Sequence, residues 1–583
     1  MNQTRLSPFI HLLVRHGVFL FLLLLVPFII TYPLPFHLTD AMFMPGDNFI
    51  TMWTTAWQVH ALASPEDRFW DGNIFHPYPG TLALSVLRVI YVPFAALVLV
   101  VTHNPVLMEN LIYYLSLILS AWTFYAFAYY HTGSRFGALL AGLIFTCAPE
   151  RFARTPHPHQ INPIFLGPAL LSLSLALQSR TTRYMLLLAL CLILQFLTSI
   201  YLAVFTAVAV AVLFLSELPR WKERKARVFR DLLIAAGVTV AGILPWALPY
   251  LFNQIEHGFS KNMAWISDLS ARPAEYLVAG QWNWLYGWTG ELFGVTHAME
   301  DVIPPEFLFP GLIPLLCFAI ALWFYFTTED TATRSSLRFG LLLTATGFML
   351  SLGPWLHWGT EATGIPLPAY LLYEFVPGFS VIRAPARFSL LTTAGLALLT
   401  AVIVPAVIQS IRNRSTIIPH RMLQGVFFLL IFTETINTPL PLTFIPRHGG
   451  LPAVESWLAR QPEQVVIYYP LRYHLTYMYF SLWHWKKLIN GWTGYMPPVF
   501  LEDMQRLNDL SKPESFVTMS RRGVQLIVVY IRFDTQPEFI KLEPAEKEGV
   551  EYYLYVLNSR KDLFEKIYDD GSAAVYRFLP NTR

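Results

Sequence analysis

Two aspartates, Asp40 and Asp47, follow directly after the first long apolar run of the chain, residues 18–30. The stretch that carries them, residues 34–81, is rich in Trp, Tyr, His and Pro. A carboxylate acts as a general base when it lies beside the atom that loses a proton. At a membrane face its pKa also depends strongly on burial and on nearby charges. We therefore interpret Asp47 as the first candidate for a base that acts on a bilayer substrate, and Asp40 as the second.

Structural interpretations of this stretch stand beside the chemical ones. Asp47 follows a Pro-Gly turn and, with Asn48, suits the N-cap of an amphipathic helix predicted over residues 49–63. Asp40 suits a solvated loop acid. His60 on the predicted helix suits either a membrane-interface position or a contact to a sugar or an acceptor.

Cationic side chains gather in the segment PERFARTPHPHQIN, residues 149–162, which lies between two apolar runs. It contains Arg151, Arg154, His157 and His159. Arg and His at the edge of a bilayer suit an anionic phosphate headgroup, although they also serve as membrane anchors. The two histidines are two residues apart, which is a poor spacing for joint metal binding on a helix. The segment thus indicates a phosphate site more than a zinc site.

A second cationic segment, VPGFSVIRAPARF (residues 376–388), precedes another long apolar run. Its Arg383 and Arg387 are four residues apart and share one face if a helix begins at Ala384 or Pro385. Such a helix start can bind a phosphate group. The alternative, that both are anchors at a helix end, places cations on the non-cytoplasmic side against the usual trend.

Aromatic side chains offer further contacts for a sugar. Tyr201 follows a short polar break between two apolar runs, and Trp284 belongs to a Trp-rich loop over residues 253–305. Dense aromatics suit sugar stacking and a membrane-interface belt equally well. The sequence has no Walker loop, no G-x-G-x-x-G after a strand, no G-x-S-x-G and no H-E-x-x-H, so ATP hydrolysis, dinucleotide chemistry and a serine hydrolase are unsupported.

The composition shows what must position these groups. The chain is 55% hydrophobic and 14% charged, whereas soluble proteins have about 25% charged residues. We therefore predict a mostly α-helical, polytopic membrane protein. Its three cysteines all lie in apolar runs and provide no disulfide framework.

Apolar runs of about 17–25 residues are long enough to cross a bilayer. We predict eleven spanning helices, over residues 12–33, 108–130, 136–150, 161–179, 183–198, 200–217, 231–252, 306–327, 336–353, 385–409 and 420–438. The loop PRWKERKARVFR, residues 219–230, is the most basic short loop and should be cytoplasmic. Alternation from this loop makes the N-terminus cytoplasmic and places on the outer face residues 34–81, 150–160, 198–201, 253–305, 354–384 and everything after about 440.

One more apolar stretch, residues 82–102, conflicts with this alternation if it spans. We therefore predict that it is re-entrant or interfacial and that it packs against the other helices. In the alternative, residues 183–198 and 200–217 form a single long helix, residues 82–102 span, and the earlier loops change sides.

The composition changes near residue 445. Residues 463–470 and 524–531 read as buried strands, and residues 563–578 read as a hairpin around Asp-Gly. We divide the chain into a transmembrane domain, residues 1–440, and an extracytoplasmic α/β domain, residues 445–583.

At this point the chain resembles the GT-C superfamily of integral-membrane glycosyltransferases, which includes protein mannosyltransferases and aminoarabinose transferases. The resemblance covers nearly the whole chain. It lies in the acidic first outer loop, in residues 110–154, in a short helical hairpin around Leu197–Tyr201, and in the C-terminal domain. Residues 351–360 and 376–388 resemble a less characterised bacterial branch. Asp40 and Asp47 are not the adjacent Asp-Glu pair of the mannosyltransferases, so the choice of base stays open.

The resemblance implies transfer of a sugar from a polyprenyl-phosphate carrier to a glycan, lipid or protein acceptor at the outer face of a bacterial inner membrane, with inversion. Asp47 or Asp40 would be the base, and Arg151, Arg154, His157, His159, Arg383 and Arg387 would hold the phosphate. His60, Tyr201 and Trp284 would contact the sugar or the acceptor. No cofactor is certain; some members of the class use a divalent metal, and no nucleic acid is expected. A flippase for a lipid-linked saccharide and a non-catalytic scaffold for envelope assembly are the alternatives.

Overall fold

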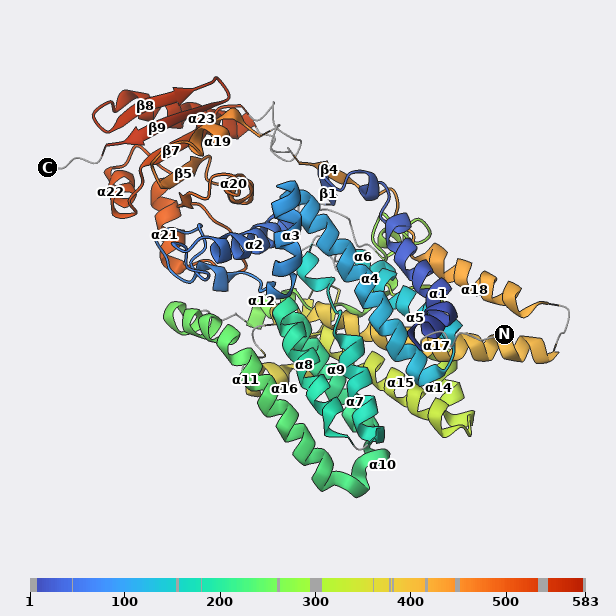
Figure 1. Ribbon diagram of the computed structural model, residues 1–583. Coiled ribbons are helices and arrows are strands. Elements are labelled where there is room, and N and C mark those ends of the chain that lie inside the picture. Colours follow the sequence, from blue (N-terminus) through green and yellow to red (C-terminus); the bar gives the residue numbers. More distant parts are fainter. Residues whose placement is uncertain are drawn as a thin grey trace, which may run out of the picture.

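The computed structural model describes residues 8–43, 46–153, 157–179, 181–258, 263–293, 307–359, 361–376, 379, 382–414, 418–445, 451–532 and 544–579. Long helices run side by side in a bundle, and a smaller α/β domain lies at one end of it (Figure 1). We call this end the domain-bearing end of the bundle. It carries the first connecting loop, residues 34–81, and the candidate site residues.

Every apolar segment predicted to span the membrane contains a helix. These helices are α1 (Pro8–Ile30), α4 (Pro105–Thr132), α5 (Arg135–Cys147), α7 (Leu166–Ser179), α8 (Thr182–Thr198), α9 (Ile200–Ser216), α11 (Lys225–His257), α14 (Leu312–Thr327), α15 (Thr331–Ser351), α17 (Ser389–Arg414) and α18 (His420–Glu434). Among the described residues, α4, α11 and the stretch Pro385–Arg414 are long and apolar enough by themselves to cross a membrane. The number of spans stays a prediction.

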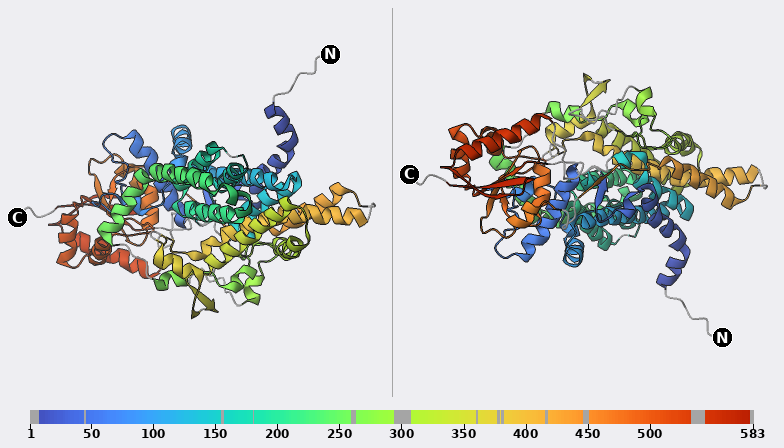
Figure 2. Two further views of the ribbon diagram at one scale, coloured as in Figure 1. Left: turned by 90° about the horizontal axis from the view of Figure 1, so that it is seen from below. Right: turned by 90° about the horizontal axis from the view of Figure 1, so that it is seen from above.

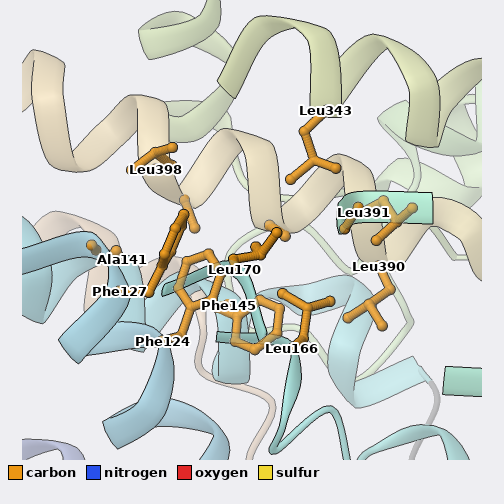
Figure 3. Close-up of a cluster of buried hydrophobic side chains, with 14 of the residues drawn as sticks. Phe124, Phe127, Ala141, Phe145, Leu166, Leu170, Leu343, Leu390, Leu391 and Leu398 are labelled. Carbon is orange, nitrogen blue, oxygen red and sulfur yellow. The ribbon is translucent and has the colours of Figure 1, made fainter. Parts of the chain in front are cut away.

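Helix α17 forms the centre of the bundle. Every residue from Ser389 to Ala401 is buried, and the helix packs against α5 and α15. Small residues permit a close approach to α15, because a Cβ on Gly347 would lie 2.3 Å from the backbone nitrogen of Thr392. Figure 3 shows the apolar side chains that α4, α5, α7, α15 and α17 contribute to this core, including Phe124, Phe145, Leu170, Leu343 and Leu391.

The segment 82–102 does not form one continuous helix. It contains two short 3₁₀ turns, Thr81–Leu84 and Val89–Tyr91, followed by α3 (Val92–Thr102). Helix α3 has 11 residues and is about 16 Å long, roughly half the thickness of the hydrocarbon core. This length supports the interfacial prediction.

The alternative in which residues 183–198 and 200–217 form a single helix is wrong. Ser199 separates α8 from α9 in an extended conformation, with φ of −168° and ψ of 125°, and the two helices pack against each other. An extended residue breaks the hydrogen-bond ladder of a helix, so the chain reverses there.

The C-terminal α/β domain contains a five-stranded sheet in the order β6-β5-β7-β9-β8. Strands β5, β6 and β7 are parallel, and β8 and β9 join them as an antiparallel hairpin. This confirms the predicted strands and the predicted Asp-Gly hairpin. The strands are β5 (Val465–Tyr469), β6 (Lys487–Leu488), β7 (Leu526–Tyr530), β8 (Phe564–Asp569) and β9 (Ala573–Phe578); the helices are α19 (Ala453–Leu458), α20 (His474–Ser481), α21 (Pro498–Leu507), α22 (Pro513–Arg521) and α23 (Pro544–Ser559).

The first connecting loop extends the edge of this sheet. The backbone nitrogen of Leu488 in β6 donates to the carbonyl of Asn73 at 2.7 Å, and the nitrogen of His76 donates back to the carbonyl of Leu488 at 2.9 Å. Helix α2 (Gly46–Ala63) packs against α20, so one apolar core is continuous from α2, α3 and α4 into β5, β7 and α20. The predicted boundary near residue 440 therefore does not divide two separate cores.

Shorter elements complete the described chain. The strands β1 (Ala41–Phe43) and β4 (Leu442–Phe444) pair antiparallel, and so do β2 (Trp355–Trp358) and β3 (Glu361–Pro366). The remaining short helices are α6 (Pro149–Ala153), α10 (Leu218–Trp221), α12 (Met263–Asp268), α13 (Thr289–Leu292) and α16 (Pro368–Phe375).

Candidate active site

Asp47 lies in the first turn of α2, where the positive end of the helix dipole favours a carboxylate. Asparagine side chains fix the backbone that leads to this turn. Asn110 of α4 donates to the carbonyls of Leu38 and Ala41 at 2.9 and 2.8 Å, and Asn48 donates to the carbonyl of Phe43 at 3.1 Å. Because α4 is a long helix of the bundle, the position of Asp47 is set by the bundle itself.

His157 is the direct partner of Asp47. Its Nδ1 donates to Asp47 Oδ2 at 2.6 Å, and the side chains are 37% and 26% exposed, respectively. Burial raises the pKa of Asp47, but the hydrogen bond from His157 and the attraction to His157 and Arg387 outweigh it, so that the pKa lies well below its usual range. Asp47 is thus an ionised carboxylate at neutral pH, held in one orientation and still partly open to solvent.

His159 follows on the short 3₁₀ turn Pro158–Gln160. Its ring is buried and lies 6.0 Å from the ring of His157 and 6.3 Å from the ring of Tyr201. Burial and then the charge of Arg387 lower the pKa of His159 well below its usual value. His159 is therefore neutral at pH 7, and its Nδ1 has no hydrogen-bond partner among the described residues.

Arg387 supplies a buried cation to the same place. It lies in the 3₁₀ turn Pro385–Phe388, at the start of α17, and its guanidinium carbon lies 5.2 Å from the centre of the Tyr201 ring. Arg383, four residues earlier, also acts electrostatically on His159. We call Asp47, His157, His159, Arg383 and Arg387 the Asp47 cluster.

The C-terminal domain contributes to this cluster as well. Arg383 Nη1 donates to the carbonyl of Gly494 at 3.5 Å, a long and weak hydrogen bond. The next residue, Tyr495, is within electrostatic reach of both Arg383 and Tyr201, and burial raises the pKa of its hydroxyl. The loop at residues 490–497 thus lies against the part of the cluster that carries Arg383.

Two further polar groups brace the cluster. Glu150, which is buried, accepts hydrogen bonds from Ser389 at 2.7 Å and from Thr393 at 3.1 Å, and so ties α6 to the start of α17. Arg151 donates to the carbonyl of Gln160 at 3.2 Å and thereby holds the histidine turn. In this structure Arg151 supports the turn that presents His157 and His159.

Three of the predicted site residues, Asp40, His60 and Trp284, do not lie at the Asp47 cluster. Asp40 lies in the turn before β1, with its Oδ1 3.5 Å from His37 Nδ1. His60 pairs with Asp67 at 3.1 Å and stacks on Trp485 of the C-terminal domain, with ring centres 4.0 Å apart.

Trp284 is exposed, and its backbone nitrogen donates to the carbonyl of Ile436. Arg154 lies outside the described residues, so its predicted role as a phosphate ligand stays a prediction.

The described residues do not provide a metal-binding set. Among them, no three His, Cys, Asp or Glu side chains form a group that could hold a metal ion. At the Asp47 cluster, Asp47 Oδ2 is engaged by His157, and the nearby Arg387 would repel a divalent cation. We therefore assign no catalytic role to a metal at the Asp47 cluster.

No model of a protein family and no curated protein matches this sequence. Solved structures do. The arabinofuranosyltransferase AftD from Mycobacteria aligns over 98% of this chain and 40% of its own, with a TM-score of 0.56 and 13% identity. The oligosaccharyltransferase of Archaeoglobus fulgidus in its apo form aligns over 97% of this chain and 74% of its own, with a TM-score of 0.51 and 10% identity. ArnT from Cupriavidus metallidurans, bound to undecaprenyl phosphate, has a TM-score of 0.46 and 12% identity, over 98% and 99% of the two chains.

The chain has the fold of the GT-C glycosyltransferases. This confirms the resemblance found in the sequence. At identities of 13% and 10% the likeness concerns the fold and not the substrate, and this chain spans less than half of AftD.

Sequence reasoning missed the loop at residues 490–497. Its signal is the segment NGWTGYMP, in which Gly, Trp, Tyr and Pro interrupt the C-terminal domain. The loop is anchored at its base, because Asn490 exchanges two hydrogen bonds with the backbone of Tyr468. Trp492 is exposed, whereas the neighbouring Thr493 is buried.

Proposed function

We propose that this protein transfers a sugar from a polyprenyl-phosphate carrier to an acceptor hydroxyl at the outer face of the membrane, with Asp47 as the general base. One observation carries the proposal. An ionised, partly exposed carboxylate lies beside a pair of arginines at the domain-bearing end of a GT-C fold. A base and a set of cations are what this transfer needs, because a proton leaves the acceptor while negative charge grows on the lipid phosphate.

The step is a single displacement. The acceptor oxygen attacks the anomeric carbon, its proton passes to Asp47, and the bond between that carbon and the phosphate oxygen breaks with its electron pair on the phosphate. In the proposal Arg387 and Arg383 hold the phosphate charge. Both lie close enough to His159 to lower its pKa, so their positive charges reach the same place. Attack opposite to the leaving group inverts the anomeric centre.

The low pKa of Asp47 makes it a weak base in the empty site. Binding of the donor changes this, because the phosphate neutralises the field of Arg387 that contributes to the low pKa. The pKa of Asp47 rises when the phosphate arrives. The carboxylate thus becomes a better base only when there is a donor to use.

His157 and the loop at residues 490–497 have supporting roles in the proposal. The hydrogen bond from His157 fixes the carboxylate in one orientation, and orientation of the reacting groups supplies a large part of the rate. The loop lies against Arg383 and so borders the part of the site where the proposal places the donor phosphate.

The test uses a strain that lacks the protein and is complemented with wild type, Asp47→Asn or Asp40→Asn. Mass spectrometry measures the pool of polyprenyl-phosphate sugars. We expect one such species to accumulate in the deletion strain and with D47N, whose turnover should fall about 10²–10⁴-fold. Wild type and D40N should clear it, because Asp40 lies apart from the cluster.

Two further measurements separate loss of chemistry from loss of fold. D47N should keep the thermal midpoint of the wild type and should still bind decaprenyl phosphate in nanodiscs. If D47N clears the pool as fast as wild type does, the base is wrong. If no polyprenyl-phosphate sugar accumulates in the deletion strain, the proposed transfer itself fails and a scaffold role gains support.

A further inference from the structure

The hairpin formed by β2 and β3 stands apart from the body of the protein. It begins four residues after α15 ends at Ser351, and α15 itself packs against the 3₁₀ turn that carries Arg387. Figure 2 shows it in both views as a pair of yellow-green strands that project sideways from the bundle, across the direction of the long helices. All six residues of β3 are exposed.

The polarity of this hairpin is the reverse of a water-facing one. Successive residues of a strand point to opposite faces. His357 is buried and lies 3.2 Å from the hydroxyl of Ser267 in α12. The next residue, Trp358, is 84% exposed. A hairpin in water would turn the imidazole outward and the indole inward.

Helix α16 continues the same pattern directly after the hairpin. Ala369 and Tyr373, four residues apart, share one helical face and are buried. Leu371 and Phe375, also four apart, share another face and are 56% and 72% exposed. The ring of Trp355 lies 5.0 Å from that of Tyr370 and ties the hairpin to the helix. The exposed apolar side chains therefore belong to one structural unit.

A lipid surface explains these exposed side chains best. The unit is continuous with the end of α15, which is predicted to leave the bilayer there, and Trp is enriched where a membrane meets water. Two exposed carboxylates lie within the unit: Glu361 pairs with Trp358 across the hairpin, and Glu374 lies between Leu371 and Phe375 on α16. They limit the insertion to the interface, where carboxylates still reach water and the headgroups.

We propose that the β2–β3 hairpin and α16 form a membrane-seated unit that inserts Trp358, Ile365, Leu371 and Phe375 into the interface of the leaflet next to the C-terminal domain. The buried face of the unit reaches the active site. The hydroxyl of Tyr373 donates to the carbonyl of Ile382 at 2.7 Å, one residue before Arg383. The unit is thus hydrogen-bonded to the segment that carries Arg383. The inference does not depend on the chemistry proposed above.

Site-directed spin labelling tests the insertion in the full-length protein. The three native cysteines are buried, so Trp358→Cys and Ile365→Cys can be labelled selectively in nanodiscs of phosphatidylethanolamine and phosphatidylglycerol. Power saturation compares collisions with oxygen, which concentrates in lipid, and with a water-soluble nickel chelate. Val240→Cys on the exposed face of α11 and Val517→Cys on α22 of the C-terminal domain are the lipid and water controls.

We expect the oxygen-to-nickel ratio at positions 358 and 365 to exceed that at position 517 several-fold and to approach that at position 240. A ratio equal to that at position 517 shows a water-facing hairpin and overturns the proposal. Low accessibility to both agents shows a protein partner or a second copy at this face and also overturns it. Because both labelled positions are exposed in the native fold, neither substitution should disturb folding.

Discussion

Two carboxylate–histidine pairs in this molecule, Glu455 with His484 and Asp47 with His157, contain the same chemical groups in different surroundings. Glu455 in the C-terminal domain is fully buried; it accepts a hydrogen bond from Tyr468 at 2.8 Å and another from Tyr530, and it lies 3.4 Å from His484. Asp47 is partly exposed, and among the described residues its direct side-chain partner is His157, with cations beyond it.

The two pairs differ in which groups surround the carboxylate. Neutral hydroxyls and a histidine surround Glu455 completely, so its charge is satisfied within the domain and has no use for a ligand. Around Asp47 the positive groups exceed the negative ones, and part of the surface is open. Arg387 is buried whereas Arg383 is partly exposed, and a buried cation is costly unless an anion joins it. We therefore propose that the Asp47 cluster receives an anionic group and that the Glu455 cluster does not.

Replacing Glu455 gives the sharpest contrast with D47N. In Glu455→Ala the hydroxyls of Tyr468 and Tyr530 lose their acceptor inside the core, which should cost about 3 kcal/mol of unfolding free energy. Thermal unfolding followed by tryptophan fluorescence should show a clear drop in the midpoint, while the folded fraction keeps its rate of transfer. Loss of activity without loss of stability would mean that the two pairs do not differ in the way described.

The cations of the Asp47 cluster offer the next test. Arg387→Ala should weaken binding of decaprenyl phosphate about 10–100-fold, or ~1.4–2.8 kcal/mol, because it removes a buried partner of the phosphate. Arg387→Lys should lose less, since it keeps the charge but not the planar fork. Binding is measured in nanodiscs by microscale thermophoresis. Equal affinities for all three proteins would place the phosphate elsewhere.

The pH dependence of stability reports on a third group, His474, which lies at the base of the loop at residues 490–497 and belongs to neither pair. Burial lowers the pKa of His474 to about 4, and its Nδ1 accepts a hydrogen bond from the nitrogen of Gly491. The unfolded chain takes up its proton near pH 6.5 and the folded one only near pH 4, so stability should fall as pH drops through this window, by about 2 kcal/mol at pH 5.

Thermal midpoints at pH 7.5 and pH 5 check this expectation. His474→Gln, which keeps an acceptor but does not titrate, should reduce the acid-induced drop. An unchanged drop in that variant would assign the effect to other buried histidines.

The smallest expected effect concerns Tyr495. Tyr495→Phe removes one hydroxyl near Arg383 and Tyr201 and should slow transfer about threefold or less, with no change in the thermal midpoint. Trp288→Phe, in an exposed position of the Trp-rich loop, serves as the matched control and should have no effect. A large loss with Y495F would make the C-terminal domain a direct participant in the chemistry.

Much of this architecture follows from apolar patterning. The spanning helices, the strands β5 and β7 and the hairpin around Gly571 lie where runs of apolar residues and turn residues predict them. The meeting of Asp47, His157 and Arg387 also follows from the sequence, because topology alone places their loops at the same end of the bundle.

What could not be predicted depends on contacts that leave no side-chain pattern. The pairing of Asn73 and His76 with β6 uses backbone groups only, so nothing in the sequence marks it. The same docking turns His60 toward Trp485 and away from the cluster, and it brings Gly494 to Arg383. At Trp284 a side-chain pattern is present but ambiguous, because an aromatic residue in an exposed loop suits contact with sugar and with lipid equally well.

The docking of the first connecting loop on the edge of the sheet restricts how this protein can be cut or recombined. A fragment that begins near residue 450 would leave β6 with open hydrogen-bonding groups, which invites pairing with other chains. A membrane fragment without the sheet would in turn expose α2 and α3, and with them Asp47, the proposed base. A chimaera that exchanges the C-terminal part for that of another protein must therefore carry the matching segment at residues 66–91, so the two pieces are inherited as one unit although some 370 residues separate them along the chain.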